Sequence, residues 1–68
     1  MTLYPVISKN LVAVGYNPSS MILRIKFRNS TYDFYDVPES IYKGLLNAPS
    51  KSYYHDTYIK NSYRHTKI

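Results

Sequence analysis

Three runs rich in β-branched and aromatic residues occupy the first half of this 68-residue chain, and they constrain its fold more than any other feature. The runs cover residues 11–16, 21–28 and 31–37, and turn-forming residues, Asn17 in one gap and Asn29 in the other, separate them. Such runs are typical of β-strands, and connections this short join antiparallel neighbours. The sequence therefore predicts a three-stranded antiparallel meander.

The register of this meander follows from its turns. A two-residue turn after Arg28 sets Ile25 opposite Phe34 and Lys26 opposite Asp33, and the four-residue loop before it sets Tyr16 opposite Met21, Val14 opposite Leu23 and Val12 opposite Ile25. This register places the apolar residues of all three strands on one face: Val12, Val14, Tyr16, Leu23, Ile25, Phe27, Tyr32 and Phe34. The other face carries Arg24, Lys26, Arg28, Asp33 and Tyr35.

Residues 38–47 are predicted to form a helix that covers the apolar face of the meander. Two apolar pairs at i,i+4 spacing, Ile41 with Leu45 and Tyr42 with Leu46, form its buried stripe. Gly44 is unfavourable within a helix, which suggests that a strand or a partner chain approaches closely there. After residue 50 the pattern weakens to a short helix or turn and an irregular tail, so the fold class is α+β.

Length and composition limit the class of protein. We expect one domain over residues 1–68, without disulfides because there is no cysteine. A core this small favours a homo-oligomer. The net charge of +5 favours anionic partners such as nucleotides, RNA or anionic membranes. The longest apolar run, residues 11–16, is too short to cross a bilayer and no secretory signal is recognisable, so we expect a cytoplasmic protein without a membrane partner.

The C-terminal stretch combines tyrosines with basic residues, as nucleotide sites do. Aromatic rings can stack on bases while cations, hydroxyls and backbone amides bind phosphates. The candidates for phosphate binding are Ser50, Lys51, Ser52, Lys60 and Arg64. Those for base stacking are Tyr54 and Tyr63. The alternative interpretation is that the tyrosines build the core, that the serines cap a turn and that the basic tail is solvated.

Two further groups of residues were weighed. Arg24, Lys26 and Arg28 could follow a nucleic-acid backbone, but Asp33 opposite Lys26 favours a solvated, partly neutralised face. His55, Asp56 and His65 could cleave RNA or bind a metal, yet their spacing matches no known ligand pattern and no activated nucleophile is recognisable. We therefore assign no catalytic residue, metal or cofactor, and expect a protein that is not an enzyme.

The chain resembles the KTSC domain over about residues 8–68. The resemblance lies in Asn10-Leu11 and Val14-Gly15-Tyr16, in Leu23, Ile25 and Phe27, in Tyr32-Asp33-Phe34 and Val37-Pro38, in Tyr42, Leu45 and Leu46, and in Ala48-Pro49-Ser50-Lys51 and Ile59-Lys60. Three residues depart from the family pattern: Phe34 replaces a tyrosine, Ser52 a glycine and Lys60 an arginine.

The resemblance implies binding of a phosphodiester. KTSC domains occur as stand-alone proteins in bacteria and phages and at the C-terminus of some lysyl-tRNA synthetases. They have been thought to bind RNA. Small phage-encoded relatives look like sponges that sequester cyclic oligonucleotide immune signals. Our leading hypothesis is a non-enzymatic sponge that binds such a signal at a subunit interface. The alternatives are an RNA-binding domain and a structural homo-oligomerisation module.

Overall fold

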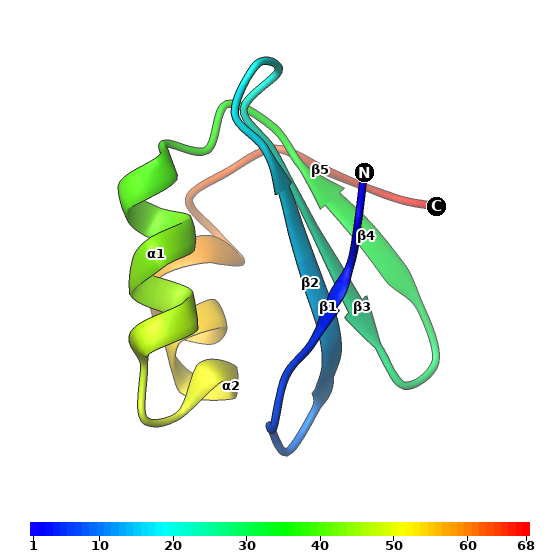
Figure 1. The fold of residues 1–68 in the computed structure, drawn as a ribbon, viewed down its shortest axis with the longest axis vertical. Coiled ribbons are helices and arrows are strands. Elements are labelled where there is room, and N and C mark those ends of the chain that lie inside the picture. Colours follow the sequence, from blue (N-terminus) through cyan, green and yellow to red (C-terminus); the bar gives the residue numbers. More distant parts are fainter.

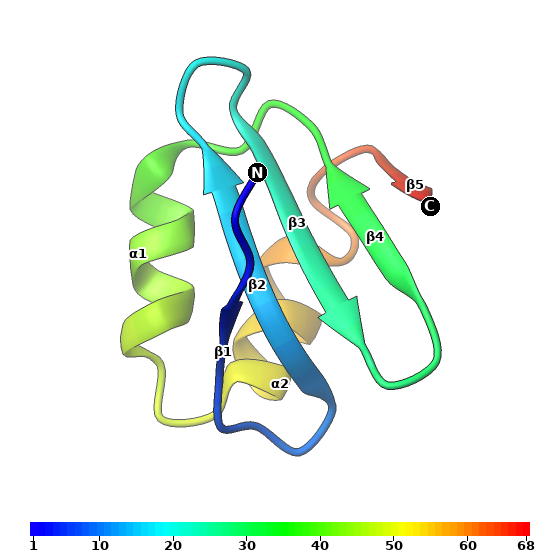
Figure 2. The same cartoon turned by 45° about the vertical axis from the view of Figure 1, so that its right-hand side comes forward.

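The alternating runs fold into an antiparallel sheet, and two short helices and a π-helical turn pack against one of its faces in the computed structural model, which describes residues 1–68 (Figure 1). The five strands lie side by side in chain order (Figure 2). They are β1 (Tyr4–Pro5), β2 (Leu11–Asn17), β3 (Ile22–Phe27), β4 (Thr31–Phe34) and β5 (His65–Lys67). The helical elements are α1 (Glu39–Asn47), α2 (Lys51–Tyr54) and the π-helical turn η1 (His55–Ile59).

The predicted meander is confirmed as β2, β3 and β4, but the sheet is wider than predicted. A two-residue strand, β1, pairs with β2, and β5 pairs with β4. The C-terminal tail, which was predicted to be irregular, therefore ends in a strand. β5 has no buried side chain, and main-chain hydrogen bonds from Tyr35 N to Arg64 O (2.9 Å) and from Ile68 N to Thr31 O (2.8 Å) flank its pairing. Because β5 is held by main-chain hydrogen bonds and buries no side chain, its sequence shows no alternation of apolar and polar residues.

The predicted register of β3 and β4 is wrong by two residues. Ile25 lies opposite Tyr32, and Arg24, not Lys26, lies opposite Asp33. The turn is longer than predicted, since Lys26 and Thr31 form the last pair and residues 27–30 make the connection. Because side chains alternate with a period of two, a shift of two residues leaves every side chain on its predicted face.

The first hairpin differs from the prediction in the same way. Val14 pairs with Ile25, while Met21 stands in the loop with a φ of 57° instead of pairing with Tyr16. The pairing shifts again between Leu11 and Ala13, where the extra residue forms a bulge. Val12 is 40% exposed as a result, and Leu11, 3% exposed, takes the predicted place of Val12 in the core.

The core lies between the sheet and the helical layer. Eight buried residues form it: Leu11, Val14, Leu23, Ile25, Phe34, Val37, Leu45 and Ile59. Helix α1 contributes Leu45, whereas Leu46, which was predicted to lie in the buried stripe, is 38% exposed. The close neighbour of Gly44 within the chain is a helix and not a strand. Gly44 faces the ring of Tyr54 from α2, and a Cβ at this position would overlap that side chain.

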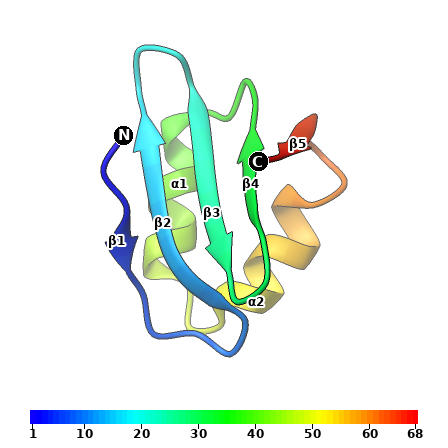
Figure 3. The ribbon, with the colours of Figure 1, turned by 90° about the vertical axis from the view of Figure 1, so that its right-hand side faces the viewer.

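The opposite face of the sheet has no helix on it (Figure 3). Asp33 is buried there and accepts two hydrogen bonds from Arg24, at 2.7 Å from Nε and 2.9 Å from Nη2. The hydrogen bonding raises the pKa of the Arg24 guanidinium. The first residues of the chain cross β2, and a Cβ on Gly15 would lie 2.5 Å from the carbonyl oxygen of Thr2. None of the helices has the length and hydrophobicity needed to span a membrane.

Candidate functional site

A pocket lined by aromatic side chains opens between the sheet and the π-helical turn. Its volume is about 210 Å³, and we call it the aromatic pocket. The residues that line it come from β3, the β3–β4 turn, β4, η1 with the residue after it, and β5: Phe27, Ser30, Tyr32, Phe34, His55, Lys60 and His65. Five separate parts of the chain thus meet in one small site.

The rings of the aromatic pocket contact one another, edge to face in three pairs and tilted in the pair of His65 with Phe34. His55 lies 5.0 Å from Phe27 and 5.6 Å from Phe34, centroid to centroid. His65 lies 5.2 Å from Phe34 and 5.7 Å from Tyr32. Such contacts each contribute about 0.5–1.5 kcal/mol beyond the burial of apolar area. The two histidines therefore belong to one aromatic wall, in which His55 is buried and His65 is exposed.

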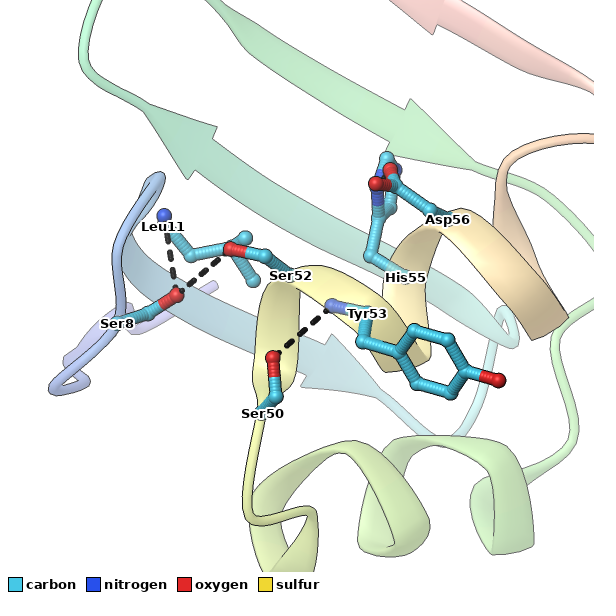
Figure 4. A network of polar contacts seen from close by, with 7 residues as sticks. All are labelled: Ser8, Leu11, Ser50, Ser52, Tyr53, His55 and Asp56. Carbon is cyan, nitrogen blue, oxygen red and sulfur yellow. Dashed lines mark hydrogen bonds and ion pairs between the residues drawn. The ribbon is translucent and has the colours of Figure 1, made fainter.

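His55 is the most buried polar residue of this wall. Its side chain points from the helical layer toward the sheet, with Asp56 beside it (Figure 4), and Nδ1 lies 3.1 Å from Asp56 Oδ1. Burial lowers the pKa of His55; the hydrogen bond to Asp56 opposes this shift, and the charges of Lys60 and His65 reinforce it. His55 is consequently neutral near pH 7.

Lys60 is the cation of the aromatic pocket. The amide of Lys60 donates to the carbonyl oxygen of His55 at 2.9 Å, five residues back, which closes the wide π-helical turn. Ile59 is fully buried by this turn, while Lys60 is exposed beside the pocket. Lys67 shares a strand face with His65 because the two residues are separated by one position in β5. No acidic residue lines the pocket.

A second hollow lies between the end of α1 and α2, and we call it the tyrosine hollow. Its volume is about 470 Å³, and Gly44, Asn47, Ala48, Pro49, Ser50, Tyr53, Tyr54 and Tyr58 line it. Tyr53 and Tyr58 are 67% and 51% exposed. The hollow is larger than the aromatic pocket, but no cationic residue lines it.

The predicted phosphate-binding segment has structural partners of its own (Figure 4). Ser50 is the N-cap of α2, where its Oγ accepts a hydrogen bond from the amide of Tyr53 at 3.3 Å. Lys51 Nζ donates to the carbonyl oxygen of Ala48 at 3.2 Å. Ser52 Oγ lies 3.2 Å from Ser8 Oγ, which ties α2 to the loop before β2. The capping role weighed for the serines is thus realised at Ser50.

The remaining predicted site residues are divided among different places. Tyr54 and Tyr63 are half-buried and pack against the core, and burial raises the pKa of Tyr54. Arg64 stacks on Tyr35, with its Cζ 5.0 Å from the ring centroid. Lys60 is the one predicted residue that lines the aromatic pocket. The structure therefore does not bring the predicted residues together in one pocket between Ser50 and Arg64.

Sequence reasoning missed most of the aromatic pocket. It assigned Phe27, Tyr32 and Phe34 to the core and gave the two histidines no role, because their spacing matches no known ligand pattern and no activated nucleophile is recognisable. The common face of the three aromatic residues was a usable signal, but the pairing of β5 that brings His65 to them was not. No group of three or more histidine, aspartate or glutamate side chains is arranged to hold a metal ion.

Comparison with known proteins identifies the domain. Residues 7–63 match the family model of the KTSC domain. A protein of Tsukamurella paurometabola is 34% identical over 61 residues, which are 88% of this chain and 91% of that protein. A lysine–tRNA ligase of a Nostoc species is 32% identical over 57 residues, which cover 82% of this chain but only 10% of the ligase.

A solved structure has the same fold over nearly its whole length. The crystal structure of a KTSC domain protein from Yersinia pestis matches with a TM-score of 0.96 and 34% sequence identity. The match covers 98% of this chain and 96% of that one.

Proposed function

The chain belongs to the KTSC domain family, and we propose that it acts as a non-enzymatic nucleotide-binding module whose ligand occupies the aromatic pocket. The observation that carries this proposal is the combination of ring surfaces with one cation and no acid in a single pocket. Aromatic side chains contribute about 1–3 kcal/mol per stacked base, and a lysine at the rim can pair with a phosphate.

The size of the aromatic pocket limits what one chain can enclose. Pockets for drug-sized ligands have volumes of about 300–1,000 Å³, and this pocket has about 210 Å³. One chain can therefore enclose about one base. A cyclic oligonucleotide has several, so its sequestration needs a second copy of the chain. We propose that a homo-oligomer supplies this copy and that the protein acts as a sponge for such a signal.

A second candidate function is RNA binding. The observation that favours it is the similarity to part of a ligase whose name states that it acts on tRNA. A pocket for one base suits a single-stranded loop, since proteins read RNA mainly through bases that are splayed out. RNA binding needs no second copy of the chain, which separates it from the sponge.

Calorimetric titration with cyclic di- and trinucleotides and with short single-stranded RNAs tests the proposal. A sponge should bind one small cyclic ligand per chain pair at saturation and release it intact on denaturation. An RNA binder should prefer longer strands and lose affinity steeply with salt, because each neutralised phosphate releases a counterion. If no ligand of either class binds or raises the melting temperature, the proposed function fails.

A pair of lysine variants places the site. Lys60→Ala should weaken binding at least about tenfold, since it removes the cation of the aromatic pocket. Lys43→Ala is the matched control. Lys43 is exposed on α1, and its substitution removes the same charge from the protein. Equal losses in both variants would mean that net charge alone attracts the ligand and that the aromatic pocket is not the site.

A further inference from the structure

The polar side chains of the aromatic pocket differ in whether they donate or accept hydrogen bonds. Nδ1 of His55 faces a carboxylate oxygen of Asp56, which can only accept a hydrogen bond. Nδ1 therefore carries the proton. In a neutral imidazole the other nitrogen, Nε2, is then an acceptor without a proton.

Nε2 of His55 retains some contact with solvent although the residue is only 8% exposed. The one hydrogen bond of this ring is the one from Nδ1, and no buried side-chain nitrogen or oxygen in the protein lacks a partner. Nε2 must therefore reach solvent, and the space in front of the residue is the aromatic pocket. A ligand there meets an acceptor held in place by the ring contacts of His55.

His65 presents the same kind of acceptor. Its Nδ1 lies 3.4 Å from the carbonyl oxygen of Tyr63, which also can only accept. The proton again belongs on Nδ1, and Nε2 is the second acceptor of the pocket. Lys60 adds a donor at the same pocket. The pocket thus offers two acceptors and a cationic donor.

We infer that the aromatic pocket selects guanine over the other bases. The Watson–Crick edge of guanine has two donor groups, N1–H and the 2-amino group, beside one acceptor, O6. Adenine, cytosine and uracil each have a single donor group on that edge. Guanine alone can satisfy both histidine acceptors while O6 accepts from Lys60. This inference rests on the proposed nucleotide binding and adds the identity of the base.

An NMR titration with the four ribonucleoside 5′-monophosphates tests the selection. GMP should bind roughly tenfold more tightly than UMP at pH 7.5, since it forms one more hydrogen bond to an otherwise unpaired acceptor. Inosine monophosphate, which lacks only the 2-amino group, should lose this advantage over UMP. Equal binding of all four nucleotides would overturn the selection and leave the proposed function standing. Absence of binding by any would overturn both.

The variant His65→Phe separates reading of the base from stacking. It keeps an aromatic ring at an exposed strand position and removes the acceptor. GMP affinity should fall to the level of UMP, whereas Lys43→Ala should keep the preference for GMP. A guanine preference that survives His65→Phe would contradict the role of His65, and one that also survives His55→Phe would overturn the inference.

Acidification separates base recognition from attraction to phosphate. The charged groups around His55 are Asp56, Lys60 and His65. Protonation of the His55 imidazole converts its acceptor into a donor, so the preference for GMP should shrink as the pH is lowered from 7.5 to 5.5. If the histidines bound phosphate instead, the affinity for every nucleotide would rise over the same range, and that result would overturn the inference.

Discussion

The aromatic pocket and the tyrosine hollow are both hollows with aromatic linings, yet they differ in what their polar atoms can do. The aromatic pocket has Lys60 and two imidazoles with unpaired acceptors. In the tyrosine hollow Ser50 caps a helix, and Tyr54 is half-buried against α1. The number of tyrosines therefore does not distinguish the two hollows. The cation and the unpaired polar atoms do, and for that reason we propose the aromatic pocket as the nucleotide site.

If the tyrosine hollow is structural, Tyr54→Ala should give the largest loss of stability. Removal of a half-buried ring that packs against the core should cost about 2–3 kcal/mol. Urea unfolding measures this loss. Tyr53→Ala removes the same side chain one position earlier, where it is 67% exposed, and should change stability by less than about 0.5 kcal/mol. Similar losses in both variants would contradict the assignment.

Gly44→Ala should destabilise the same region by a smaller amount. A methyl group there overlaps the ring of Tyr54, and overpacking costs about 1–3 kcal/mol, against a gain of about 1 kcal/mol in helix propensity. The hydroxyl of Tyr54 is the nearest atom to that methyl group. Tyr54→Phe in the Gly44→Ala background should therefore recover part of the loss, as thermal unfolding can show, and no recovery would place the clash elsewhere.

Ser50→Ala should affect stability without affecting the ligand. Loss of the N-cap hydrogen bond to Tyr53 should cost about 0.5–1 kcal/mol. Nucleotide affinity should remain that of the unchanged protein, because Ser50 does not line the aromatic pocket. A large loss of affinity in a folded Ser50→Ala protein would move the phosphate site back to α2 and break the contrast between the two hollows.

The smallest expected effect is a pH dependence of stability from the aromatic pocket. The folded pKa of His55 lies below its ordinary value, so the unfolded chain binds a proton first. The stability is complete above about pH 6.5 and falls as the pH drops below this value, until the folded protein is protonated too. Urea unfolding at pH 7.5 and 5.5 measures the fall. His55→Phe should reduce it, and an unchanged fall would assign it to other groups.

The sequence predicted the elements that bury side chains at regular intervals. It did not predict the features that depend on main-chain pairing alone. β2, β3, β4 and α1 were recognisable because their side chains face the core at regular intervals. The register was not, since a shift of two residues preserves each face. All side chains of β5 are exposed, so no alternation of apolar residues predicted this strand.

The candidate site was harder to predict than the fold for the same reason. Lys60 was identified from its charge, but the residues that line the pocket with it are up to 38 positions apart in the sequence, from Phe27 to His65. The pairing of β5 with β4 brings these segments together, and no sequence pattern indicates that pairing. The packing of Tyr54 beside Gly44 was not predictable, because the residues next to a tyrosine in the sequence do not show whether its ring stacks on a base or fills a gap in the core.

The aromatic pocket is complete only while the short strand β5 is paired with β4. His65 reaches the pocket only while this exposed three-residue strand is docked on β4. Strands at an edge with little buried area detach at a free energy well below that of global unfolding, and their amide protons exchange with solvent early. A ligand that needs His65 binds only the docked form and must slow this exchange. Hydrogen exchange at Ile68, whose amide bonds to Thr31, therefore reports occupancy of a pocket that Ile68 does not line.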